Sequence, residues 1–403
     1  MLKDLKQIEI LTEKYGSPMY VFNEQGFVKN YEHLVNAFKQ WYDNYQIAYS
    51  FKTNYTPYIA SIVERLGGFA EVVSGMEYYI AKKIGFSDHK IIFNGPNKGI
   101  EGKTAFLNGC ILNIDNLEEA KTLCNTARDN PKKFFEVGIR VNIDVGQNFI
   151  SRFGLDVCDI PVVFELISEI DNIEIVGLHC HISRCRGLEA WAKRAETMLD
   201  LADEYFLPVP KYIDLGSGMF GSMDTEFALQ FGEVATYEEY ASHVAGMFAK
   251  HYEHHERKPL LITEPGTTLI NKHVDFIGRV DAIKCLRGKN IAILNCSEHN
   301  LGETCLLKEL PMYIVPVGAQ KSYTDIDITG YTCLEQDVMR KNYNGKLAVG
   351  DYVVFGNVGG YSNVLKPPFI MPNCQMIAIC PDGNTKVIKK AETYDDILKT
   401  YIF

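Results

Sequence analysis

The sequence has no long apolar run, and no stretch approaches the ~20 consecutive apolar residues that a bilayer-spanning helix needs. Residues 1–18 mix charged and apolar positions like an amphipathic helix, which a secretory signal peptide does not do. Positive charge is also scarce, because 41 Lys and Arg residues face 51 Asp and Glu residues and leave a formal net charge of −10. Nucleic-acid-binding proteins usually present a basic surface. These absences predict a cytoplasmic chain without a membrane or nucleic-acid partner.

The 403 residues include eleven cysteines, but no two of them form a C-x-x-C pair. An odd number without such spacing disfavours a disulfide framework and a structural zinc site, and it fits a reducing cytoplasm. His251, His254 and His255 lie close together in sequence, but the charged residues around them are typical of a solvated helix face. We therefore predict no metal site.

Short apolar strands alternate with helical stretches through the first two thirds of the chain. Each candidate strand is rich in Ile, Val, Leu and Tyr, as expected of strands that are buried on both faces. Helical periodicity is clearest at 117–128 and 188–206. Eight strand–helix units in series predict a parallel (β/α)8 barrel of the TIM type over residues 25–266. The eight candidate strands are 47–52, 69–73, 90–95, 110–115, 136–142, 175–181, 212–218 and 260–266.

After residue 266 the pattern changes to a series of strands without intervening helices. This part predicts a mostly antiparallel β domain, either a sandwich or a barrel-like sheet. Residues 20–22 form another strand-like segment near the N-terminus, which we expect to join the second sheet. The β domain is therefore predicted to combine residues 1–24 and 267–403.

Polar side chains end the predicted barrel strands, at the face where such barrels build their active sites. Lys52 ends the first strand, where partial burial would lower the pKa of its amine and suit a Schiff-base lysine. The alternative is a surface lysine that extends from a strand end into solvent. His181 ends the sixth strand and could stack on a flat cofactor or shuttle protons, although a core histidine or a metal ligand would look the same.

Two further features follow the last two strands. Gly216, Ser217 and Gly218 form a turn whose backbone amides could approach a phosphate, although glycine-rich turns are common. Glu264 could pair with a protonated ring nitrogen, or it could simply cap a helix or form a salt bridge. A lysine for an aldehyde, amides for a phosphate, a carboxylate for a pyridinium and a histidine for a ring face together match pyridoxal 5′-phosphate (PLP).

The chain resembles the fold-type III PLP-dependent decarboxylases, the family of diaminopimelate and ornithine decarboxylases, over nearly its whole length. The matching segments include the lysine motif, a D-V-V-S-x-G-E element with Glu71 in place of the aspartate, an R-V-N and an S-K-F-G element, and E-P-G. In this sequence they read Tyr49-Ser-Phe-Lys52, Glu71-Val-Val-Ser74 followed by Glu77, Arg140-Val-Asn142, Ser151-Arg-Phe-Gly154 and Glu264-Pro-Gly266.

The resemblance also implies roles for residues of the β domain. Cys333 and Asp337 match the family's C-x-x-x-D segment, in which the cysteine comes from the partner subunit and returns a proton after CO2 leaves. The aspartate of that segment contacts substrate. Tyr361 matches a tyrosine that reaches the PLP phosphate. The resemblance thus implies a homodimer whose active sites are shared between subunits.

Three departures bear on the substrate. Arg184 stands where the family's H-I-G-S motif has its serine, and Thr267 stands where E-P-G-R has its arginine. The R-P-x-x-Y element reads Leu310-Pro-Met-Tyr313 and lacks its arginine. An arginine–carboxylate pair has a fixed fork geometry that threonine and leucine cannot reproduce. We therefore expect that meso-diaminopimelate is not the substrate.

The resulting prediction is a PLP-dependent decarboxylase, a carboxy-lyase, that acts on an amino acid or an amino-acid-like metabolite. Lys52, Cys333 and His181 are the predicted catalytic residues. An amino-acid racemase or epimerase on the same fold is the first alternative, and a non-catalytic PLP carrier is the second. The predicted substrate contacts are Asp337, Tyr313 and Thr267, and the predicted cofactor contacts are Lys52, Glu71, His181, Arg184, Gly216, Ser217, Gly218, Glu264, Gly266 and Tyr361.

Overall fold

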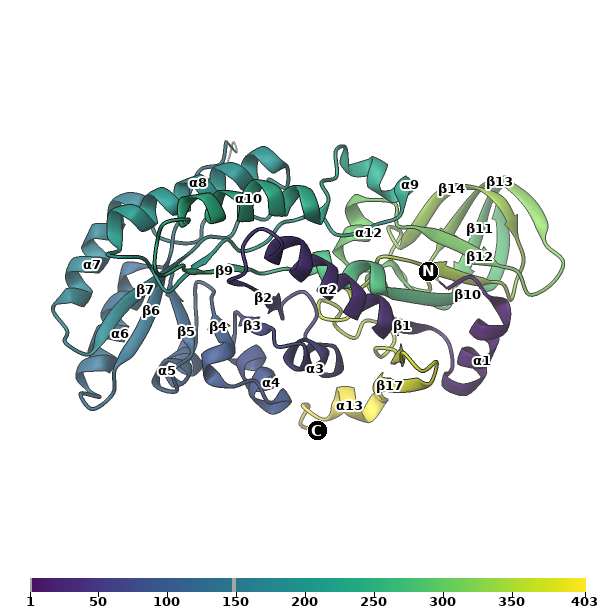
Figure 1. Cartoon of the computed structure of the whole chain (residues 1–403). Coiled ribbons are helices and arrows are strands. Elements are labelled where there is room, and N and C mark those ends of the chain that lie inside the picture. Colours follow the sequence, from purple (N-terminus) through teal and green to yellow (C-terminus); the bar gives the residue numbers. More distant parts are fainter. Residues whose placement is uncertain (1, 147–149) are drawn as a thin grey trace. The chain divides into compact units, whose positions relative to one another are not determined.

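The chain forms two compact units, one built around a barrel and one around a β-sheet (Figure 1). The computed structural model describes residues 2–146 and 150–403. The barrel unit comprises residues 30–220 and 234–268, and the β unit comprises residues 1–29, 221–233 and 269–403. The β unit thus includes the segment 221–233, which the sequence pattern did not assign to it. The boundaries at 24/25 and 266/267 stay a prediction.

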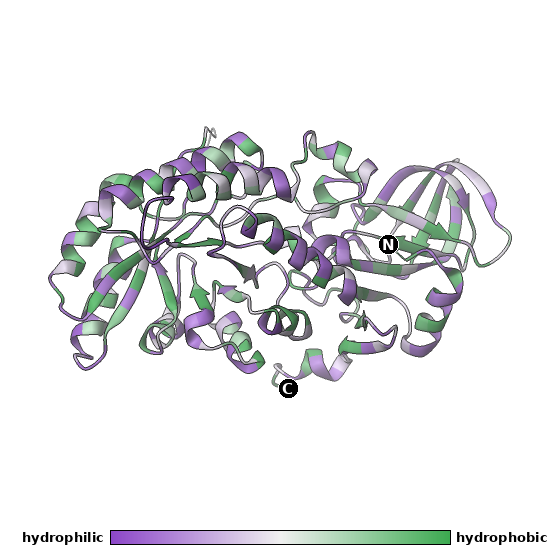
Figure 2. Cartoon of the chain, viewed as in Figure 1, coloured by the Kyte–Doolittle hydropathy of each residue, from purple (hydrophilic) through white to green (hydrophobic). Residues whose placement is uncertain are grey.

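Eight parallel strands close into a barrel, which confirms the predicted fold class. Each strand is short and almost wholly buried, and Figure 2 shows how hydrophobic these segments are compared with the mixed surfaces of the helices. The strands are β2 (Tyr45–Ser50), β3 (Phe69–Val72), β4 (Ile91–Phe93), β5 (Ile111–Ile114), β6 (Phe135–Arg140), β7 (Ile173–His179), β8 (Tyr212–Asp214) and β9 (Leu260–Thr263).

Helices follow the barrel strands along the chain, and their caps explain where several of them begin. Ser74 and Asn116 accept hydrogen bonds from the backbone three residues later, and Thr236 forms a reciprocal capping box with Glu239. The helices are α3 (Pro57–Arg65), α4 (Gly75–Ile84), α5 (Gly99–Leu107), α6 (Leu117–Arg128), α7 (Ile160–Ser168), α8 (Leu188–Tyr205) and α10 (Tyr237–His251).

Helix α2 (Glu24–Lys39) precedes the first barrel strand and packs beside α10. His33 Nε2 lies 2.6 Å from Glu238 Oε1, and the Tyr237 hydroxyl donates to Asn30 Oδ1 at 3.0 Å. The last strand, β9, is followed only by the short helix α11 (Thr267–Ile270). The helix before the first strand therefore covers the place where an eighth helix would otherwise follow the last strand.

The β unit joins the N-terminus of the chain to its C-terminal half. Strand β1 (Met19–Asn23) pairs antiparallel with β10 and parallel with β16, as the apolar segment 20–22 predicted. Most other pairs are antiparallel, and β11 with β13 is a second parallel pair. The remaining strands are β10 (Val274–Leu286), β11 (Lys289–Leu294), β12 (Met312–Val315), β13 (Lys321–Thr329), β14 (Val338–Leu347), β15 (Tyr352–Phe355), β16 (Met376–Ile379) and β17 (Thr385–Lys389).

The β unit also holds elements that the apolar pattern did not reveal. Strand β14 is mostly polar, and only two of its ten residues are buried. Its pairing with β13, and not a hydrophobic run, makes it a strand. The short helices are α1 (Leu5–Tyr15), α9 (Thr225–Ala228), α12 (Glu303–Leu307) and α13 (Tyr394–Leu398). No helix in the described part of the chain has the length and apolar character needed to cross a bilayer.

Two barrel glycines make room for one aromatic ring. A Cβ atom on Gly138 of β6 would lie 1.9 Å from the Tyr212 hydroxyl, and one on Gly177 of β7 would lie 2.4 Å from the Tyr212 ring. Tyr212 belongs to a buried cluster with Ile92, Val176 and other barrel residues. The absence of these two side chains is therefore a steric requirement of the barrel core.

We expect Gly138→Ala to lower the free energy of unfolding by about 3 kcal/mol or more, because the added methyl group has no space that a small shift can open. Gly187→Ala is the matched control, since a Cβ there meets nothing within 4 Å. Denaturant unfolding of both variants measures the difference. Equal stability of the two variants would contradict this account of the core.

Candidate active site

The strand ends of the barrel bring four polar side chains from neighbouring strands together. Lys52 follows β2, Glu71 lies within β3, Asn94 follows β4, and Glu264 follows β9. The order β9, β2, β3, β4 is continuous around the closed barrel. Because all these strands are parallel, their carboxyl ends meet at one face.

Lys52 is held by an acidic partner at this face. Its Nζ atom forms an ion pair with Glu71 Oε2 and donates to Ser50 Oγ at 2.7 Å. Ser50 Oγ donates in turn to the same Glu71 oxygen at 2.5 Å. The lysine side chain is 27% exposed while the glutamate is 1% exposed. The amine is therefore fixed in direction, while part of the lysine side chain stays exposed.

Glu264 is a buried carboxylate with several polar partners. His179 Nε2 lies 3.3 Å from Oε1, and His181 Nδ1 lies 3.4 Å from Oε2. Burial by itself would raise the pKa of Glu264, but its contacts with His179 and His181 and the positive charge of Lys52 hold that pKa well below its ordinary value. Glu264 is therefore ionised over the physiological pH range.

Asp214 shows the opposite behaviour next to Glu264. Polar atoms of Asp214, Glu264 and His179 all lie within 4.8 Å of one another. Burial and the negative charge of Glu264 raise the pKa of Asp214 well above its ordinary value. The two neighbouring carboxyl groups thus differ in protonation, because the environment favours the ionised form of Glu264 and the protonated form of Asp214.

His181 is neutral at this position. Burial lowers its pKa to about 4, and the charge of Lys52 acts in the same direction. The Ser217 backbone N–H donates to His181 Nδ1 at 3.2 Å, and the same nitrogen lies 3.4 Å from Glu264 Oε2. A neutral imidazole with a fixed ring suits contact with a flat aromatic group.

The glycine turn after β8 is tied to the rest of the site. Gly216 N–H donates to Asp214 Oδ1 at 2.8 Å, and Ser217 N–H is the donor to His181. A Cβ on Gly218, which has a φ of 103°, would lie 2.5 Å from the Ile182 carbonyl. Two of the three backbone N–H groups in this turn, those of Gly216 and Ser217, thus donate hydrogen bonds to other residues of the protein. The phosphate-binding role of the turn stays a prediction.

Arg194 holds the backbone of this turn and was not identified from the sequence. It lies on α8 and is fully buried, and its guanidinium donates to the carbonyl groups of Leu215, Ser217 and Ile182 at 2.8 to 2.9 Å. An available signal was its place on the apolar face of the helix, between Trp191 and Met198. A charged residue at such a position requires buried partners.

The other predicted cofactor and substrate contacts of the barrel unit lie on loops after its strands. Arg184 is exposed in the loop that follows β7. Gly266 follows β9, and a Cβ there would lie 2.0 Å from Thr53 Oγ1. Thr267 begins α11. Their contacts with cofactor or substrate stay predictions.

The predicted residues of the β unit occupy two kinds of environment. Cys333 is exposed, whereas Asp337 is buried and accepts hydrogen bonds from the Glu298 amide and from Thr332. Asp337 thus holds the loop that carries Cys333. Tyr361 has a φ of 54°, a left-handed conformation that is strained for a tyrosine, and Tyr313 is 39% exposed on β12. The assignment of these four residues to the active site stays a prediction.

The barrel residues fit PLP as a cofactor. The amine of the partly exposed Lys52 suits the aldehyde, and the shielded, ionised Glu264 suits a protonated ring nitrogen. When bound, PLP supplies a ring that accepts the electrons released at the substrate Cα. A parallel barrel with this set of groups at the carboxyl ends of its strands is the site of a PLP-dependent enzyme.

The family described as "Pyridoxal-dependent decarboxylase, pyridoxal binding domain" matches residues 28–271. The chain therefore belongs to the pyridoxal-dependent decarboxylases. It is a PLP-dependent carboxy-lyase, which confirms the predicted cofactor and the predicted class of enzyme. The racemase and carrier alternatives find no support in this match.

Relatives align with the chain from end to end. The diaminopimelate decarboxylase of Aquifex aeolicus is 26% identical and the alignment covers 96% of this chain and 92% of the relative. That of Archaeoglobus fulgidus is 27% identical over 99% of this chain and 96% of the relative. The crystal structure of the Methanocaldococcus jannaschii enzyme matches the fold with a TM-score of 0.85 at 24% identity, covering 98% of this chain and 94% of that one.

The expectation that meso-diaminopimelate is not the substrate is wrong. It is opposed by full-length relatives that are diaminopimelate decarboxylases in several organisms. The physical reason is that the absence of an arginine from one short motif does not exclude a guanidinium that another strand supplies. Arg340 on β14 donates from Nη2 to the carbonyl of Leu310 at 2.6 Å, so a guanidinium from another strand lies beside the position where the motif has its arginine.

Glu77, on the first turn of α4, makes the stability of the folded protein depend on pH. Burial raises its pKa to about 7, although the Val73 amide donates to it at 2.7 Å. A pKa that is raised in the folded state favours the folded protein at low pH, and this stabilisation is lost as the pH rises from about 4.5 through about 7.

We expect wild-type stability to fall relative to Glu77→Gln by about 2–3 kcal/mol between pH 5 and pH 8, since Gln cannot ionise. Glu165→Gln, at an exposed position of α7, is the control for a simple loss of charge. Urea unfolding of the three proteins across this pH range measures the effect. A stability difference that stays constant with pH would refute the assignment.

Proposed function

We propose that the enzyme decarboxylates meso-diaminopimelate to L-lysine. The observation that carries this proposal is the pairing of a partly exposed Lys52 with a buried, ionised Glu264 in a chain that aligns end to end with diaminopimelate decarboxylases. Solved relatives with this fold are described in complex with L-lysine. Loss of one carboxyl group from diaminopimelate as CO2, with a proton taking its place, gives lysine.

Each residue of the barrel has a defined task in this proposal. Lys52 would hold the cofactor, and Glu71 with Ser50 directs its amine. Glu264 would keep a proton on the ring nitrogen, which favours cleavage of the bond between Cα and the carboxylate. His181 would cover one face of the ring as a neutral group.

Reprotonation at Cα is assigned to Cys333. Its loop is anchored by the buried Asp337 while the thiol itself is exposed, which suits delivery to a partner subunit. We therefore include in the proposal a homodimer in which each subunit donates Cys333 to its partner. The eleven cysteines form no disulfide among the described residues, which supports a cytoplasmic location.

The function is tested by supplying the holoenzyme with meso-diaminopimelate and measuring both CO2 and lysine. We expect equal amounts of the two products, and loss of both in Lys52→Ala together with the visible absorbance of covalently held cofactor. Exchange of the Cα hydrogen with deuterated solvent without release of CO2 would overturn the proposal in favour of racemisation. Release of CO2 from another amino acid alone would overturn the substrate.

A further inference from the structure

A chain of buried hydrogen bonds runs through the barrel to the active site. The Tyr212 hydroxyl donates to Asn113 Oδ1 at 2.7 Å, and Asn113 Nδ2 donates to Asn94 Oδ1 at 2.8 Å. Asn94 Nδ2 then donates to Glu264 Oε1 at 2.5 Å and approaches Glu71 Oε1 at 3.3 Å. All five side chains are at most 4% exposed.

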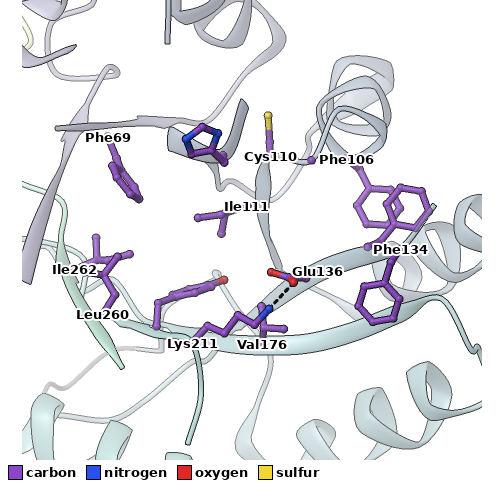
Figure 3. Close-up of a pocket in the computed structure, with 14 residues that line it drawn as sticks. Phe69, Phe106, Cys110, Ile111, Phe134, Glu136, Val176, Lys211, Leu260 and Ile262 are labelled. Atoms are coloured by element: carbon purple, nitrogen blue, oxygen red, sulfur yellow. Dashed lines mark hydrogen bonds and ion pairs between the residues drawn. The ribbon is translucent and has the colours of Figure 1, made fainter. Parts of the chain in front are cut away.

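The far end of this chain lies at the opposite mouth of the barrel. Tyr212 lines a cavity of about 350 Å3 together with the residues that begin β3, β5 and β9, namely Phe69, Ile111 and Leu260 (Figure 3). An ion pair between Lys211 and Glu136 also borders this cavity. The hydrogen bonds thus connect the two ends of the barrel, and Tyr212 stands at the end remote from Lys52.

Every donor in the chain points the same way. An asparagine amide can rotate to exchange its oxygen and its amino group, but a reversed Asn94 would place its oxygen against two carboxylates. Asn113 opposes this by donating to that oxygen, and the Tyr212 hydroxyl donates in turn to Asn113 Oδ1. Burial raises the pKa of Tyr212 well above its ordinary value, so the hydroxyl keeps its proton and remains a donor. Aligned hydrogen bonds also strengthen one another.

Asn94 is the member of the hydrogen-bond chain whose amino group reaches both Glu71 and Glu264. Glu71 is paired with Lys52, and Glu264 contacts the two histidines, so Asn94 joins the acidic partner of the amine to the buried carboxylate. Two buried carboxylates repel one another unless a donor lies between them. The absence of a side chain at Gly138 leaves space for the Tyr212 hydroxyl and for Asn113 Oδ1, and Gly177 leaves space for the Tyr212 ring.

We propose that Asn94, oriented by Asn113 and Tyr212, is a positioning residue that holds Glu264 and Glu71 in place for the cofactor. This inference concerns the binding of PLP and is independent of which amino acid is decarboxylated. It assigns a function to three buried polar side chains, those of Asn94, Asn113 and Tyr212.

The test compares cofactor affinity in three variants, measured by titrating PLP into cofactor-free protein and following absorbance across pH. Asn94→Ala should weaken PLP binding about 10- to 100-fold, as expected for a lost hydrogen bond to a charged group. Tyr212→Phe keeps the ring and removes only the hydroxyl, and it should weaken binding about two- to fivefold because it acts through two amides.

Tyr42→Phe is the matched control, because its buried hydroxyl donates to the Pro259 carbonyl at 2.7 Å and lies outside the chain of hydrogen bonds. It should lower the Tm about as much as Tyr212→Phe but leave PLP affinity and its pH dependence unchanged. The proposal is overturned if Tyr212→Phe and Tyr42→Phe bind PLP alike, or if a folded Asn94→Ala binds PLP as the wild type does. The comparison of the two tyrosines decides the question even if Asn94→Ala fails to fold.

Discussion

The burial of an ionised carboxylate is the interaction on which the rest of the site depends. Glu264 has almost no exposure to water, so the protein must replace the lost hydration with contacts from His179, His181 and Asn94. Its charge in turn keeps a proton on Asp214, which leaves one carboxylate and one carboxylic acid side by side. A preorganised charge of this kind costs no rearrangement when a cofactor binds.

The closed parallel barrel explains how such a cluster can be built. Its members come from strands or strand ends that are far apart in sequence, and only closure brings β9 next to β2. The same closure makes the interior narrow, so the ring of Tyr212 fits only where β6 and β7 carry glycine. Packing and electrostatics are therefore linked, because the residue that fills the core also starts the hydrogen bonds that reach Glu264.

The misjudged substrate illustrates a limit of reading motifs one at a time. The motif lacks an arginine at position 310, but a missing motif side chain does not show that no cation is nearby. Strand β14 supplies Arg340 to the carbonyl of Leu310, although β14 has too few apolar residues to be recognised as a strand. A side chain contributed by another strand can occupy the same space, and a local pattern carries no information about it.

The sequence by itself determined the alternation of strands and helices, the joining of residues 20–22 to the second sheet, and the cofactor class, because these depend on local periodicity and on short motifs. It also indicated Lys52 and Glu264, since each ends a buried strand. Only the tertiary structure decided that Glu71 pairs with Lys52, that Arg194 holds the glycine turn, and that Asn94, Asn113 and Tyr212 form one chain. These contacts join residues up to 170 positions apart, as for Asn94 and Glu264, and their strength comes from burial that exists only once the barrel has closed.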